Sequence, residues 1–182
     1  MFSTPTKLIL EIPHQVNSFK PLIEECCSFI SDIKHFSDDF SRTSKFKLVI
    51  MELLTNAIKH CNSTSYLEIH IQDHQLLIRK IDCGKKFSFL DDESKEDYQF
   101  PIATFKEPFL INALLGNNYK LSLLIKSENH IEFLEPPEID YLAINEIPEN
   151  FGLMIIRKCV DVFQYYYEEK TFSNIFEVTF KF

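Results

Sequence analysis

Residues 48–60 read Leu48-Val-Ile-Met-Glu52-Leu-Leu-Thr-Asn56-Ala-Ile-Lys59-His60, and their apolar side chains recur at the spacing of an amphipathic helix. Glu52 and Asn56 are four positions apart, and Lys59-His60 follow three and four positions later, so these polar side chains share one face of the predicted helix. A neutral Asn beside core positions needs hydrogen-bonding partners, and water on an ordinary solvent-facing stripe can supply them as well as a ligand can. The helix by itself therefore leaves both interpretations open.

The ligand chemistry that suits such a stripe is metal-assisted phosphoryl transfer. The side-chain oxygen of Asn56 can ligate Mg²⁺, and the carboxylate of Glu52, one helical turn earlier, can accept a proton. Lys59 or His60 can reach phosphate oxygens. What the rest of the chain places beside this helix decides between the two interpretations.

The segments around this helix predict an α+β order. A Ser- and Asp-rich cluster at residues 37–44 offers N-caps for the helix, and Asn62 is placed to close it. Two strand-like runs around Gln72-Asp73-His74-Gln75 predict a hairpin. The elements predicted for the first half are strand 7–12, helix 16–33, the helix that ends near residue 60, and strands 66–71 and 76–81.

The second half is less regular. Residues 85–108 are polar and acidic, which predicts a mobile loop, and Phe109–Leu115 predicts a short helix ended by Gly116. The remaining predicted elements are a hairpin of strands 119–125 and 130–134, a helix that begins near 153 and includes Phe163, and strands 162–167 and 175–182. Without a repeat or a linker, residues 1–182 are predicted to form one domain, with a lid and insertion at about 85–150.

The composition argues against several classes of partner. The chain has 19 Lys and Arg against 27 Asp and Glu, a net charge of −8, and no basic run, so nucleic acid and membranes are poor partners. No apolar run approaches the ~20 residues of a bilayer span, and the N-terminus has no signal-like apolar stretch. The five cysteines are odd in number and lack metal-ligand spacing, which favours reduced thiols. We therefore expect a cytoplasmic protein.

Three motifs resemble those of the GHKL (Bergerat-fold) ATPases, the superfamily that includes histidine kinases, gyrase and the anti-sigma-factor serine kinases. Glu52-x-x-x-Asn56-x-x-Lys59-His60 resembles the N box. Asp82-Cys-Gly84-Lys-Lys-Phe87 resembles the G1 box in the form seen in the serine-kinase branch, and Asn150-Phe-Gly152-Leu153 with the helix after it resembles the G2 box. The three follow the family's order, and the resemblance covers residues 7–182 except for a long middle segment.

The resemblance implies a fold and a set of roles. The fold would be a two-layer α/β sandwich of the Bergerat type, with a mixed, mostly antiparallel sheet covered on one face by helices and an extra hairpin in the lid region. The ligands would be ATP and Mg²⁺, with Asn56 on the metal and Glu52 as general base. The implied nucleotide-binding residues are Asn56, Lys59, His60, Asp82, Gly84, Phe87, Gly152 and Leu153, with Asp82 accepting the adenine amino group and Gly152 near the phosphates.

The function implied is that of an anti-sigma-type serine/threonine kinase, which phosphorylates a small regulatory protein such as an anti-sigma antagonist or binds a sigma-factor-like partner. The G2 region departs from the pattern, because Pro148–Gly152 offers one glycine where active relatives carry two or three. A degenerate module that holds nucleotide or a protein without catalysis is therefore the alternative, and a domain without nucleotide is a third.

Other sites have weaker support. Five histidines, His14, His35, His70, His74 and His130, have no paired spacing for zinc. The inserted hairpin at 119–134 is either a decoration of the sheet or a partner-binding or lid element. The aromatic C-terminal segment predicts a sheet with one buried face, although Tyr165-Tyr166-Tyr167 could instead mark a homodimer surface.

Overall fold

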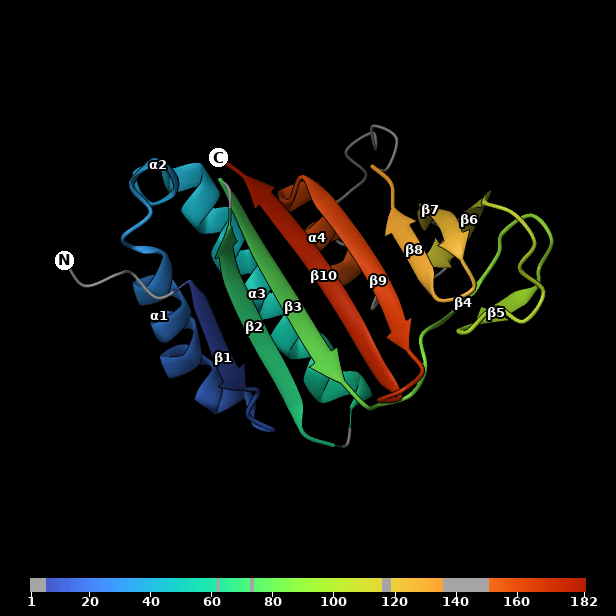
Figure 1. Cartoon of the computed structure of the whole chain (residues 1–182), viewed down its shortest axis with the longest axis horizontal. Coiled ribbons are helices and arrows are strands. Elements are labelled where there is room, and N and C mark those ends of the chain that lie inside the picture. Colours follow the sequence, from blue (N-terminus) through green and yellow to red (C-terminus); the bar gives the residue numbers. More distant parts are fainter. Residues whose placement is uncertain (1–5, 62, 73, 116–118, 136–150) are drawn as a thin grey trace.

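The computed structural model describes residues 6–61, 63–72, 74–115, 119–135 and 151–182 as an α+β structure with a large antiparallel sheet (Figure 1). The strands of the main sheet are β1 (Lys7–Glu11), β2 (Ser65–Gln72), β3 (Gln75–Asp82), β6 (Phe109–Leu115), β7 (Tyr119–Ser127), β8 (His130–Phe133), β9 (Val162–Glu168) and β10 (Ser173–Lys181). Their order is β1-β2-β3-β10-β9-β8-β7-β6, and each neighbouring pair is antiparallel. The predicted parallel component of a mixed sheet is therefore wrong for the described strands.

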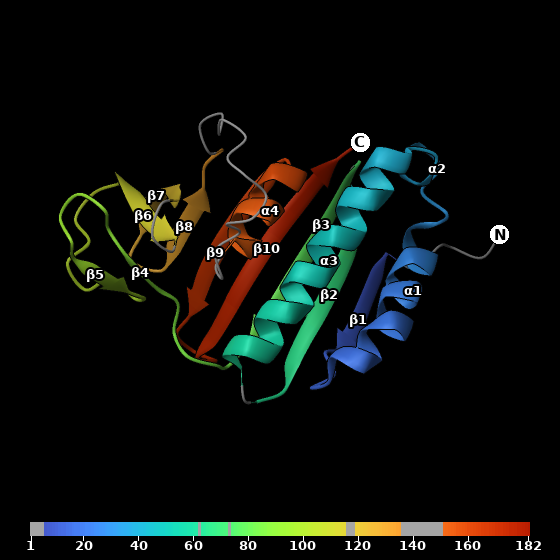
Figure 2. The same cartoon turned by 180° about the vertical axis from the view of Figure 1, so that it is seen from behind.

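Helices lie on one face of this sheet, over the part formed by β1, β2, β3, β10 and β9 (Figure 2). They are η1 (Val16–Ser18), α1 (Phe19–Ile30), α2 (Lys34–Ser37), α3 (Phe40–His60) and α4 (Gly152–Cys159). Seen from behind, α1, α3 and α4 lie in front of the strands (Figure 2), whereas the opposite view shows the uncovered face of the sheet (Figure 1). The helix layer thus places α3 and α4 beside each other over the centre of the sheet.

The predicted periodicity of α3 is confirmed. Its buried residues recur every three or four positions and are Phe46, Val49, Ile50, Leu53, Leu54 and Ala57. The helix begins after Asp39, whose side chain accepts a hydrogen bond from the backbone N–H of Arg42 at 3.1 Å, as an N-cap does. Because the apolar stripe packs on the sheet, the polar stripe is turned toward α4.

Two segments of the second half differ from their predictions. Phe109–Leu115 is strand β6 and not a helix, because it pairs in register with β7 and alternates, with Ile111 and Ala113 buried and Leu110 exposed. A seven-residue apolar run carries no decisive period of its own. The partner strand decided its conformation.

The acidic segment after β3 is folded and is not a mobile loop. It forms a small antiparallel pair, β4 (Ser88–Leu90) with β5 (Asp97–Gln99), and it buries Phe100 and Ile102. Asp91 lies between the two strands, and its carboxylate accepts hydrogen bonds from the backbone N–H and the hydroxyl of Ser94 at 2.8 and 2.7 Å. Aromatic residues lie among the acidic ones and supply apolar contacts. The polar composition of the segment does not reveal these contacts.

The remaining predicted elements agree more closely with the structure. The hairpins at 66–81 and at 119–134 are present, and the second one extends the main sheet. The last helix is shorter than predicted, since α4 ends at Cys159 and Phe163 belongs to β9. β9 alternates between buried and half-buried residues, as a sheet with one buried face requires. Asn62, Gly116 and Pro136 to Asn150 lie outside the described residues.

Candidate functional site

A cavity of about 300 Å³ lies between the helix layer and the strands that extend the sheet. One wall is polar and comes from α3, the end of β3 and the start of α4. The other wall is apolar and comes from Phe87, Phe89 and the strands β6 to β8. Polar groups thus line a pocket together with hydrophobic and aromatic side chains, a combination that is usual in small-molecule sites.

Most of the residues predicted to bind nucleotide meet at this cavity, although they come from three distant segments. Those that line it are Glu52, Asn56, Lys59, His60, Asp82, Phe87, Gly152 and Leu153. Gly84 does not line the cavity, but its backbone N–H donates to the carboxylate of Asp82, which does, at 2.8 Å. The structure therefore brings the predicted residues together, while their roles stay predictions.

The start of α4 lies over the polar stripe of α3. A Cβ atom added to Gly152 would come within 2.5 Å of Glu52 Oε2 and 3.8 Å of Asn56 Oδ1. No larger residue fits there without moving the Glu52 carboxylate. Glu52 and Asn56 are thus half-buried against α4 and the cavity, unlike residues of an ordinary solvent-facing stripe, whereas Lys59 and His60 at the end of the helix are exposed.

This environment shifts two titratable groups. Burial raises the pKa of Glu52 above its ordinary value, and the positive charge of Lys59 only partly opposes the shift. Desolvation lowers the pKa of His60, and the charges of Lys80 and Lys59 lower it further. Near neutral pH His60 is therefore uncharged, and Glu52 is a better proton acceptor than a solvated carboxylate.

Asp82, at the end of β3, is held from several sides. It is 4% exposed, and its Oδ1 accepts hydrogen bonds from Gly84 N and from Asn174 Nδ2, the latter at 3.0 Å. Its Oδ2 forms an ion pair with Lys80, which is 2% exposed. The carboxylate is therefore fixed in one orientation at the polar wall of the cavity.

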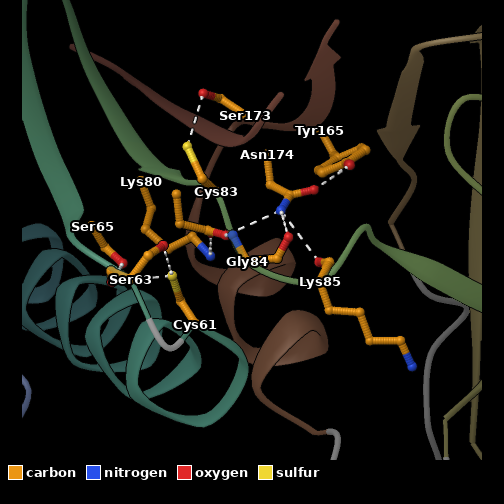
Figure 3. Close-up of polar contacts among 11 residues, drawn as sticks. Cys61, Ser63, Ser65, Lys80, Cys83, Gly84, Lys85, Tyr165, Ser173 and Asn174 are labelled. Atoms are coloured by element: carbon orange, nitrogen blue, oxygen red, sulfur yellow. Dashed lines mark hydrogen bonds and ion pairs between the residues drawn. The ribbon is translucent and has the colours of Figure 1, made fainter. Parts of the chain in front are cut away.

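Asn174 connects β10 to the loop after β3. Figure 3 shows its side chain between the hydroxyl of Tyr165, which donates to Asn174 Oδ1 at 2.8 Å, and the loop carrying Gly84 and Lys85. Asn174 Nδ2 also donates to the backbone carbonyls of Gly84 and Lys85 at 3.4 and 3.2 Å. Because Asn174 is buried and Tyr165 sits in the aromatic core, this network anchors the loop.

Lys80 and Asn174 were missed by the motif analysis. A period of two along Leu76-Leu-Ile78-Arg-Lys80-Ile-Asp82 already places Lys80 on the same face as Asp82, so that signal was present in the sequence. Asn174 carried no comparable signal. It lies opposite Asp82 only because β10 pairs with β3 in that register, across 92 residues of chain.

The cavity is cationic although the protein is acidic. Four lysines and two carboxylates line it, namely Lys59, Lys80, Lys85, Lys86, Glu52 and Asp82. With His60 neutral, these groups sum to 4 − 2 = +2, whereas the whole chain carries −8. Three of these lysines, Lys59, Lys85 and Lys86, are exposed, and Lys80 is buried. A local positive field of this kind favours anionic ligands.

Several features bear on metals, membranes and redox chemistry. In the described part of the chain, no three His, Cys, Asp or Glu side chains are grouped to hold a metal ion by themselves. None of the described helices combines the length and apolarity needed to cross a bilayer. The five cysteines are free thiols.

No protein-family model matches the sequence, and no curated protein matches it significantly. The motifs and the geometry of the cavity are therefore the observations that bear on function.

Proposed function

We propose that this chain is a nucleotide-binding regulatory protein of the GHKL type, and that its cavity takes ATP with Mg²⁺. One observation carries the proposal: the residues of three short motifs, separated by up to 101 positions, line one cavity whose charge is positive in an acidic protein. An unrelated domain has no reason to assemble these particular residues. An anionic ligand also accounts for the lysines.

The arrangement of elements agrees with a Bergerat-type fold. In that fold the N-box helix and the helix after the G2 box would lie on the same face of the sheet, as α3 and α4 do here (Figure 2). Strands β6 to β8 are an addition at the far edge of the sheet, and they supply the apolar wall of the cavity. We assign this extension the role of enclosing the base, which is one form of the lid predicted from the sequence.

The residues present suit the nucleotide. Asp82 can accept the adenine amino group, and Phe87 with the apolar wall can pack on the faces of the ring. The phosphates would lie toward Lys59 and the first turn of α4, because a helix N-terminus favours anions.

The donor set also suits Mg²⁺. The side-chain oxygen of Asn56 would ligate the ion, since it lies beside Gly152 at the start of α4 and Mg²⁺ typically combines one or two protein oxygens with those of phosphates. When bound, the ion would neutralise charge on the phosphates.

The reaction we propose is transfer of the γ-phosphoryl group to a Ser or Thr of a small regulatory protein, such as an anti-sigma antagonist or a sigma-factor-like partner. The hydroxyl oxygen would form the new P–O bond as the bond to the β-phosphate breaks, which leaves ADP. Glu52 would take the hydroxyl proton, since its raised pKa suits a base. We place the protein in the cytoplasm and leave a homodimer as an alternative assembly.

A second function, nucleotide or protein binding without catalysis, is favoured by the position of Glu52. Its carboxylate lies beside the first residue of α4, where it would compete with phosphate for the helix N-terminus. The G2 region also offers one glycine where active relatives carry two or three. Sequestration of a partner would then be the mode of regulation.

A binding experiment tests the nucleotide site. A fluorescent ATP analogue should bind in the presence of Mg²⁺, and Asn56→Ala should abolish the Mg²⁺-dependent part of the affinity. Asn17→Ala, on the exposed η1, is the matched control and should bind as the wild type does. No binding at millimolar nucleotide, together with an unchanged melting temperature, would refute the proposal, since a site filled at 100 times its Kd adds about 2.7 kcal/mol.

A transfer assay separates the two functions. Radiolabelled ATP and candidate partner proteins should give a phosphorylated Ser or Thr, and Glu52→Gln should remove transfer while nucleotide still binds. Glu24→Gln, an exposed carboxylate on α1, should leave transfer unchanged. Binding without transfer to any partner, in wild type and variants alike, would leave the non-catalytic function.

A further inference from the structure

Lys80 occupies a position of the fold that packing alone would give to an apolar residue. On β3 it shares the buried face with Leu76 and Ile78, and it lies opposite Leu67 of β2 and Phe176 of β10. It is 2% exposed. Desolvating an ammonium group is expensive even when it is paired, so a buried lysine here points to a role in binding.

The contacts of Lys80 leave part of its donor capacity for a ligand. Its ammonium group pairs with Asp82 Oδ2 and lies 4.5 Å from the centre of the Phe176 ring. An ammonium carries three N–H donors, so these two contacts within the described structure leave one donor at the cavity, which Lys80 lines.

Asp82 has a matching acceptor left. Its Oδ1 already accepts from Gly84 N and Asn174 Nδ2, whereas Oδ2 accepts from Lys80 among the described residues. A carboxylate oxygen accepts about two hydrogen bonds, so Oδ2 retains one position. The end of the cavity thus presents one donor beside one acceptor, both held in place.

We infer that Lys80 reads the base directly: Asp82 Oδ2 accepts the amino N6–H of adenine while Lys80 donates to the ring nitrogen N1. This inference rests on the proposed nucleotide site. Adenine offers one donor and one acceptor side by side on this edge, and so leaves neither group unsatisfied. The same edge of guanine carries the acceptor O6, which Lys80 could reach, but it also carries two donors, N1–H and the N2 amino group. Asp82 Oδ2 has one acceptor position left, so one of these two donors would stay unsatisfied.

Base analogues test the inference on the wild-type protein. Competition against a fluorescent ATP analogue, with Mg²⁺, compares ATP with 1-deaza-ATP, which lacks N1, and with 7-deaza-ATP, which keeps N1 and the amino group. Loss of a hydrogen bond from a charged donor should weaken 1-deaza-ATP by about ten- to a hundredfold, and 7-deaza-ATP should bind as ATP does. Equal binding of all three would overturn the role of Lys80 and leave the nucleotide site standing. No binding by any of them would count against the nucleotide site itself.

A variant pair locates the effect. In Lys80→Met the ratio between ATP and 1-deaza-ATP should fall to about one, because N1 has lost its donor. In Lys86→Met, which removes another lysine of the same cavity, the wild-type ratio should persist. The ratio of the two affinities is measured on the same protein, so a loss of stability does not change it. If Lys80→Met does not fold, the comparison of the three nucleotides on the wild-type protein decides the role of Lys80. GTP should bind more weakly than ATP, and tighter binding of GTP would overturn the assignment to adenine.

Discussion

The two walls of the cavity consist of different kinds of side chain, and burial of these side chains contributes differently to the stability of the protein. The polar wall places charged groups such as Lys80 and Asp82 at core positions, where burial opposes their charge. The apolar wall gains from burial, since Leu121, Leu123 and Phe133 are each 1% exposed and Phe133 stacks on Phe163 with ring centres 4.0 Å apart. Under the proposed function, ligand chemistry accounts for the polar wall, whereas packing alone accounts for the apolar wall. Substitutions in the apolar wall should mainly lower the free energy of unfolding, and substitutions in the polar wall should mainly weaken nucleotide binding.

The apolar wall should show the largest effect. Phe133→Ala removes a buried ring from β8 and should lower the free energy of unfolding by about 3–5 kcal/mol, through lost burial and the cavity left behind. Urea unfolding followed by circular dichroism measures the change. Leu110→Ala on β6, at a side chain 67% exposed, is the control and should change little. A loss below about 1 kcal/mol for Phe133→Ala would mean that β6 to β8 do not share the core.

Gly152 of the polar wall and Gly84, which does not line the cavity, should respond differently to an added methyl group, with an intermediate effect. An added Cβ at Gly84 would meet the backbone oxygen of His60 at 2.7 Å, and a backbone atom cannot rotate away. Gly84→Ala should therefore cost about 1–3 kcal/mol of stability.

At Gly152 the nearest atom to an added Cβ is the carboxylate end of Glu52, which can move. Gly152→Ala should therefore change stability by less than about 1 kcal/mol, and should instead weaken nucleotide binding. Thermal unfolding and binding of the fluorescent analogue, measured on both variants, make the comparison. Equal loss of stability in the two would contradict it.

The titration of Glu52 should give the smallest effect. Its folded pKa lies above its ordinary value near 4.5, so the folded protein holds this proton more tightly than the unfolded chain does. Stability from this group is therefore present below that value and is lost as pH rises through the folded pKa. Glu52→Gln removes the loss, so its melting temperature relative to wild type should rise as the pH increases above the ordinary value near 4.5. Glu24→Gln should show a flat difference, and a flat difference for Glu52→Gln would place its carboxylate in water.

The sequence predicted the half of the molecule in which local pattern and tertiary environment agree. The apolar stripe of α3, the hairpin of β2 and β3, and the grouping of Glu52, Asn56 and Lys59 on one face follow from spacing alone. The same holds for the end of β3 at Asp82, since strand period and a following glycine mark it. These features depend on residues a few positions apart.

Only the tertiary structure decided the rest, because the deciding contacts join distant segments. Phe109–Leu115 is a strand because it pairs with β7. The acidic segment after β3 is folded because its aromatic residues pack in the core. Asn174 reached Asp82 through the pairing of β10 with β3. The alternation along β3 predicts that Lys80 shares a face with Asp82. Its burial against Asp82 and Phe176 depends on the elements that pack on that face of the sheet. Spacing along the chain thus determined which side chains could face the cavity, and long-range pairing determined which of them meet there.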